Sequence, residues 1–204
     1  MARSPALAAF VGLMGDALAD ALPASHAGHR TGQRMRQALS RPATAGFHLQ
    51  PHSLPVCAHL PAALQTLREA PLPQARHWAD AIAALVPALA WQRSERAGSQ
   101  AFHAGHANTQ VVGPQGLEQR SDLVLGASLL APHTVYPDHS HPPEEIYRVL
   151  SDGDWYRAET GWTTPGIGGS VHHPPGILHA MRAGPRPLLA VWCLWVGDAG
   201  APSA

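Results

Sequence analysis

Two short histidine-bearing segments hold the side chains of this chain that are best suited to chemistry. One reads His-Ser-His-Pro-Pro-Glu-Glu-Ile-Tyr and the other Pro-Pro-Gly-Ile-Leu-His. His139 and His141, two residues apart, point to the same face of an extended strand, and Glu145 returns to that face once the chain turns, so three ligands lie within one hairpin. His179 follows the Pro-Pro-Gly turn, which brings a later strand back beside the first pair. Together the segments predict a mononuclear metal site.

The predicted ligand set contains three imidazoles and one carboxylate. Nitrogen donors with a single hard oxygen suit one divalent transition metal, namely Zn, Fe(II), Mn, Ni or Co, and disfavour Ca and Mg, which prefer oxygen ligands. The sequence does not show which of these five metals is bound. A chain with 14 histidines also produces a His-x-His pair by chance, so a surface or core role for this pair is the alternative.

Two tyrosines flank the predicted ligands. Tyr136 lies three positions before His139, and Tyr147 lies two after Glu145, so Tyr147 and Glu145 share one strand face. A nearby divalent cation favours the charged form of a phenol and lowers its pKa from about 10, which makes a tyrosine a plausible base near neutral pH. The alternative is a structural tyrosine with its hydroxyl bonded to the barrel backbone.

These patterns resemble known families. The ligand motif, with Gly-x5-Pro-x-Gly-x2-His from Gly168 to His179, resembles the two motifs of the cupin superfamily. The longer pattern Tyr-x2-His-x-His-x3-Glu-x-Tyr, from Tyr136 to Tyr147, closely resembles the cupin-type dimethylsulfoniopropionate (DMSP) lyases over about residues 120–197. Two positions depart from the cupin motifs, His133 in place of Gly and Ala183 in place of Asn, and neither supplies a ligand.

The resemblance implies a role for each site residue. His141, Glu145 and His179 would be metal ligands, with His139 a fourth ligand or an adjacent group. Tyr147 would contact the metal or the substrate, and Tyr136 would be the general base. The family reaction is a β-elimination that converts DMSP to dimethyl sulfide, acrylate and a proton.

This chemistry is also reasonable from the residues alone. A metal that binds the substrate carboxylate as a Lewis acid makes the neighbouring Cα proton easier to remove, and the sulfonium is a good leaving group. Aromatic faces bind soft cations, and the barrel segments offer Trp155, Tyr156, Trp162, Trp192 and Trp195. The alternatives are an Fe(II) dioxygenase, a lyase acting on another small carboxylate and a binding cupin without catalysis.

The hydrophobic pattern divides the chain into a helical part and a β part. Helical spacing begins after Ser4 and Pro5 and continues in segments 33–39, 61–70 and 74–91, where Pro87 should kink or end the helix. Seven short strands follow: 109–112, 123–130, 146–150, 155–157, 170–173, 179–182 and 188–196. We therefore expect a mainly β fold: a helical N-terminal region (1–105), a C-terminal cupin or jelly-roll barrel (106–198) and a flexible tail (199–204).

Composition limits the partners. The 204 residues include 14 Arg, no Lys and a net charge of zero, which disfavours nucleic acid and membrane surfaces and excludes Schiff-base chemistry on a lysine. Cys57 and Cys193 are expected to be buried and reduced, as in a cytoplasmic protein, and Asp16 and Asp20 argue against a secretory signal. A small molecule is the expected partner. The open edges of a barrel also favour a homodimer.

Overall fold

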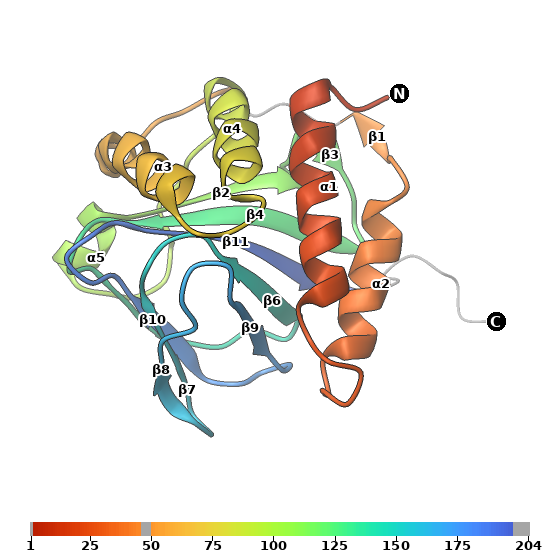
Figure 1. Cartoon of the computed structure of the whole chain (residues 1–204). Helices are drawn as coiled ribbons and strands as arrows, with labels where there is room; N and C mark the ends of the chain where they lie inside the picture. The colour runs from red at the N-terminus through yellow and green to blue at the C-terminus, as the bar shows by residue number, and fades with distance from the viewer. Residues whose placement is uncertain (1, 46–49, 198–204) are drawn as a thin grey trace.

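A computed structural model describes residues 2–45 and 50–197 of this chain. Two β-sheets face each other, and most helices pack against the outer face of the larger sheet, as Figure 1 shows. The larger sheet has the strand order β1-β3-β2-β4-β11-β6-β9, and the smaller has β5-β10-β7-β8. This is the predicted mainly β cupin barrel with helices at its N-terminal side.

The helices fill most of the first half of the chain. They are α1 (Pro5–Asp20), α2 (His29–Leu39), η1 (Pro55–His59), α3 (Leu60–Glu69), α4 (Ala75–Leu85), η2 (Val86–Ala88) and α5 (Gln100–Gly105). The side chain of Ser4 accepts a hydrogen bond from the amide of Leu7, and Pro5 follows as the first helical residue, as predicted. Pro87 ends α4 in a short 3₁₀ turn, also as predicted. None of the helices in the described ranges is long and apolar enough to cross a membrane.

The strands lie mainly in the second half of the chain. They are β1 (Thr44–Ala45), β2 (His106–Val112), β3 (Glu118–Gln119), β4 (Leu123–Leu130), β5 (Val135–His139), β6 (Glu144–Val149), β7 (Asp154–Arg157), β8 (Gly161–Thr163), β9 (Ser170–His173), β10 (His179–Arg182) and β11 (Leu188–Trp195). All seven predicted strands are present. The sequence pattern missed β1, β3, β5 and β8, missed α5, and placed the start of α2 too late because residues 29–32 look like loop by composition.

Strand β11 lies between two hydrophobic cores and contributes side chains to both. Its odd-numbered residues Leu189, Val191 and Cys193 face the helices, and its even-numbered residues face the space between the two sheets. Both faces are buried, so the strand reads as an unbroken apolar run. The second, inner core also contains Tyr136, Tyr147 and Trp192, so the predicted catalytic residues face the barrel interior.

The helical part is tied to the barrel by an ion pair as well as by apolar packing. Arg3, just before α1, donates two hydrogen bonds to the carboxylate of Glu118 in β3, at 2.5 and 2.8 Å. Burial raises the pKa of Glu118, but the hydrogen bonds and charge of Arg3 outweigh that effect and lower it. The boundary between residues 105 and 106 stays a prediction, and the predicted flexible tail, 199–204, lies outside the described residues.

Candidate metal centre and pocket

The four predicted ligands meet in the space between the two sheets. His139, at the end of β5, lies opposite His179, at the start of β10, in the register of the smaller sheet. Glu145 extends from β6 of the larger sheet, and its Oε2 lies 3.3 Å from Nε2 of His141 and 3.5 Å from Nε2 of His179. The structure therefore brings all four residues together, and their role as metal ligands stays a prediction.

Their local geometry differs from the expected hairpin. His141 lies in the connection after β5, beyond the end of the strand, and β5 and β6 belong to different sheets. Pro142 and Pro143 follow at once; neither has an amide proton to continue a strand ladder. The prediction that His139 and His141 share a strand face within one hairpin is therefore wrong. The ligands come together because the chain passes from one sheet to the other.

The backbone sets the tautomer of all three predicted histidine ligands. Nδ1 of His139, His141 and His179 lies 2.8–2.9 Å from the carbonyl oxygens of Pro137, Pro143 and Ile177, respectively. A carbonyl oxygen only accepts hydrogen bonds, so each Nδ1 carries a proton and donates it. In the neutral rings, the lone pair is then on Nε2. Such a bond to the second ring nitrogen is typical of metal-binding histidines.

The donor set fits a divalent ion. Nε2 of His179 has no hydrogen-bond partner among the described residues, and Nε2 of His141 and His179 both face the same carboxylate oxygen. Two lone-pair-bearing atoms at such distances repel each other unless a proton or a cation lies between them. Ligand atoms of His139, His141 and His179 all lie within 4.8 Å of one another. The cluster is therefore compatible with a transition metal, whose identity it leaves open.

Glu145 is held in its charged form despite its burial. Only 3% of its surface is exposed. Burial alone would raise its pKa, but the hydrogen bond with His141 and the nearby imidazole of His179 lower it to about 2. For His141, burial lowers the pKa, while the hydrogen bond and charge of Glu145 raise it, with a net rise. The carboxylate thus supplies the negative charge that a cation in this pocket needs.

Both predicted tyrosines line one small cavity beside the histidine cluster. The hydroxyl of Tyr136 lies 3.3 Å from Oγ of Ser94, which also accepts a hydrogen bond from the amide of Arg96. The ring of Tyr136 packs on His139 and on His106, with centroids 4.5 and 4.6 Å apart. Burial, followed by the charge of Glu145, raises the pKa of Tyr147 well above its ordinary value. The protein groups around Tyr147 therefore favour a neutral phenol.

The cavity has a volume of about 100 Å³. It is lined by Arg96, Asn108, Ser128, Tyr136, His139, His141, Glu145, Tyr147, Trp192 and Leu194. Pockets for drug-sized ligands are roughly 300–1,000 Å³, so this one suits a small molecule. Nε1 of Trp192 donates to Oγ of Ser128 at 3.0 Å, which fixes the indole ring.

A cationic side chain that no sequence motif marks also lines this cavity. Two other arginines of the barrel strands do not reach the cavity: Arg148 alternates with Tyr147 and so faces away from it, and Arg182 pairs with Asp154 at the surface. Arg96, from the loop between η2 and α5, lines the cavity instead. Its Nη1 donates to the carbonyl of Ser140, between the two motif histidines, at 3.4 Å. Ser140 lies 44 positions after Arg96, and no sequence motif or spacing connects the two segments, so this contact could not be predicted from the sequence.

Of the five aromatic residues considered for cation binding, Trp192 lines the cavity. Trp155 packs in the inner core, and its ring centroid lies 6.2 Å from that of Tyr147. Tyr156 and Trp162 pack against each other in the β7–β8 hairpin, with their rings tilted by 49°. Trp195 packs against the core on the helix side of the larger sheet.

Two turns hold the ligand segments in place. Gly176 has a φ of 72°, which favours glycine, and its amide donates to the carbonyl of His141 at 2.9 Å. The Pro-Pro-Gly turn is thereby tied to the other ligand segment.

His133 has a φ of 60°, which explains why the cupin motif has glycine at this position.

The histidines beside the motifs have different environments. His172 packs outside the cavity, with its Nε2 2.7 Å from Oε1 of Glu144, whose other oxygen accepts a hydrogen bond from Thr31. His173 is fully buried and stacks on the ring of His179, with centroids 4.0 Å apart. Burial lowers the pKa of His173 to about 3.

The fold and this histidine and carboxylate cluster define a cupin barrel with a potential metal site. The sequence model for dimethylsulfoniopropionate lyase matches residues 27–190, and the chain belongs to the DMSP lyase family. A putative DMSP lyase, DddL, from Cereibacter sphaeroides is 29% identical over 148 residues, which cover 72% of this chain and 62% of the relative. The DMSP lyase DddQ from Ruegeria pomeroyi is 41% identical over 64 residues, or 31% of each chain.

Solved structures agree with the fold. The crystal structure of DddQ from Ruegeria pomeroyi superposes with a TM-score of 0.67 at 22% identity, covering 98% of this chain and 95% of the other. A structure described as one of the DMSP lyases RdDddP and RnDddQII gives a TM-score of 0.66 at 21% identity, covering 97% and 96%. The sequence matches to the curated relatives are shorter. They span 62% of the length of the Cereibacter sphaeroides protein and 31% of the length of the Ruegeria pomeroyi protein.

Proposed function

We propose that this protein is a metal-dependent carbon–sulfur lyase that cleaves DMSP by β-elimination to dimethyl sulfide, acrylate and a proton. One observation carries the proposal: His139, His141 and Glu145 line a small cavity together with Tyr136, a side chain able to act as a base. A ligand atom of His179 lies within 4.8 Å of those of His139 and His141. Family membership supports the same reaction. DMSP is small enough for a compact cavity of this kind.

His139, His141, Glu145 and His179 would hold the metal. When bound, a divalent ion acts as a Lewis acid on the substrate carboxylate and makes the Cα proton more acidic. The three Nδ1 hydrogen bonds to backbone carbonyls orient the rings before the ion arrives. Tyr147, two residues after Glu145 on the same strand face, contacts the metal or the substrate in this proposal.

Tyr136, as phenolate, takes the proton from Cα. The electron pair of that C–H bond forms the double bond between Cα and Cβ, and the C–S bond breaks, so dimethyl sulfide leaves with its bonding pair. Charge and atoms balance without an oxidant. The hydroxyl of Ser94 lies next to the phenol oxygen and can donate a hydrogen bond to the phenolate, which stabilises the reactive form.

The other cavity residues fit the two ends of DMSP. Its carboxylate is attracted by the guanidinium of Arg96, and its sulfonium by the aromatic faces of Tyr147 and Trp192. The fixed ring of Trp192 offers such a face without losing side-chain entropy.

Arg96→Gln should raise the KM for DMSP about 10-fold with a smaller change in kcat, because a hydrogen bond to a charged group contributes about 1.5–3 kcal/mol and this residue is half-exposed. Steady-state kinetics measure both constants. Arg93→Gln, an exposed residue of the same loop, is the matched control and should leave KM unchanged. An Arg96→Gln enzyme with the KM of the parent would remove Arg96 from substrate binding.

The proposed activity is tested by incubating the metal-loaded protein with DMSP without oxygen and measuring dimethyl sulfide in the headspace and acrylate in solution. Equimolar release of both products supports the proposal. Absence of both from a folded, metal-bound protein would reject DMSP as the substrate. The cytoplasmic location and the homodimer stay predictions.

A further inference from the structure

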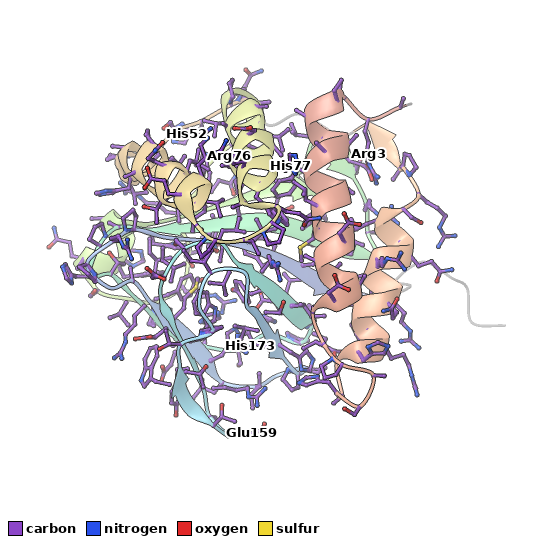
Figure 2. The ribbon with its side chains drawn as sticks, viewed as in Figure 1. Arg3, His52, Arg76, His77, Glu159 and His173 are labelled. Atoms are coloured by element: carbon purple, nitrogen blue, oxygen red, sulfur yellow. The ribbon has the colours of Figure 1, made fainter. Side chains whose placement is uncertain are left out.

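His173 is a buried histidine that lacks the partners such a residue needs. It ends β9, none of its surface is exposed, and neither ring nitrogen has a hydrogen-bond partner among the described residues. Figure 2 labels it in the interior of the molecule, among the strands of the barrel. A buried polar atom without a partner costs about 1–3 kcal/mol, and such groups are rare in native proteins. Some group other than the surrounding protein is therefore expected to contact this ring.

The strand register points His173 at the metal centre. In the β6–β9 pair, His173 lies directly opposite Glu145, so the two side chains emerge on the same face of the sheet. Its ring also stacks on that of His179 at 4.0 Å, with an interplanar angle of 20°. Ligand atoms of His173, Glu145 and His179 all lie within 4.8 Å of one another, and all three residues are buried.

Two imidazoles and one carboxylate are a sufficient protein ligand set for catalytic zinc and for non-heme iron. This set shares His179 with the group formed by His139 and His141. His173 makes no ring contact with either of those two residues in the described part of the chain. With Glu145, which lies beside His141 as well as His179, the two sets share Glu145 and His179 and differ in their other histidines.

His173 lines a different cavity from His139 and His141, while Glu145 lines the cavity of those two histidines. His139 and His141 line the 100 Å³ cavity with Tyr136, whereas His173 lines a second cavity of about 320 Å³ that also contains Arg157 and His26. An ion on the His173 side would lie further from the proposed base. Water entering from the second cavity is the competing explanation for the two unpartnered nitrogens.

We propose that His173, Glu145 and His179 form an inner binding position for a divalent transition metal, beside the outer position formed with His139 and His141. This inference rests on the proposed function only in that both require a metal at this centre. The inner position gives the ion a place to bind when the outer histidines are removed or displaced.

The test measures metal alone and uses no substrate. In the double variant His139→Ala/His141→Ala the outer position is lost and the inner set stays complete. We expect this variant to bind one Co(II) per chain, measured by elemental analysis and visible absorption, at least about 100-fold more weakly than the parent, because two ligands of the outer position are lost. Adding His173→Phe, which keeps a stacked ring but removes both nitrogens, should abolish this residual binding. Adding His77→Phe instead, an exposed histidine of α4, should leave it unchanged.

Folding is checked in the same samples by thermal unfolding with and without Co(II), because an ion that binds only the folded chain raises its Tm. The double variant should show such a rise, and the triple variant with His173→Phe should not. The proposal is overturned if the folded double variant binds no Co(II), if the triple variant binds as much as the double, or if the parent binds none. A parent that binds Co(II) but leaves DMSP intact would reject the lyase activity and leave the inner position standing.

Discussion

Tyr136→Phe should lower the rate of dimethyl sulfide release from DMSP by about 100- to 10,000-fold, the usual contribution of a positioned general base. The variant removes one oxygen atom and keeps the ring that packs on His139 and His106. The barrel and its metal content should therefore be unchanged. The rate is measured by headspace analysis at saturating DMSP, with metal content and Tm recorded for the same preparation.

Tyr156→Phe is the matched control, because Tyr156 lies in the β7–β8 hairpin and does not line the 100 Å³ cavity. Its activity should stay within about twofold of the parent, as for substitutions that do not touch the chemistry. If Tyr136→Phe kept most of the parent rate, another group would have to remove the Cα proton, and the base would be sought in Tyr147.

Glu145→Gln should remove most of the bound metal and with it the activity. The variant keeps the size of the side chain but removes the one negative charge of the predicted ligand set. Residues that only support a ligand already contribute 10- to 100-fold to metal affinity, so loss of a ligand charge should weaken binding by about 100-fold or more. Titration with a competing chelator, read by elemental analysis, measures the affinity.

Glu159→Gln provides the control of equal chemistry, since Glu159 lies at the exposed tip of the β7–β8 hairpin (Figure 2). Its affinity for metal should match that of the parent. A Glu145→Gln protein that bound metal as tightly as the parent would contradict the role given to this carboxylate.

The local pattern predicted the parts of the fold that depend on nearest neighbours. Strand β4 was predicted with the bounds Leu123–Leu130 that it has, because an apolar run ends in turn residues on both sides. The helix start at Ser4 and Pro5 was also readable, since capping depends on three or four consecutive residues. Strand β5 was missed because Pro137 and Asp138 oppose strand formation, and pairing with β10 overrides them.

The motif residues were found because their types and spacing are unusual, while the residues that serve the site through tertiary contacts were not. Arg96 and Ser94 reach the cavity from a loop between helices, and nothing in their own segment marks them. In the sequence, His173 lies directly before the Pro-Pro-Gly turn of the second motif. However, its position beside Glu145 depends on the β6–β9 register, which no local pattern specifies.

We propose that this pocket cleaves DMSP with a metal and without oxygen. The most direct measurement strips the protein with a chelator, restores single metals under anaerobic conditions, and quantifies dimethyl sulfide and acrylate from DMSP. We predict that the stripped protein is inactive and that several of Zn, Mn, Co, Ni and Fe(II) restore equimolar release of both products. Activity that needs oxygen and iron, or that survives complete removal of metal, would contradict this account.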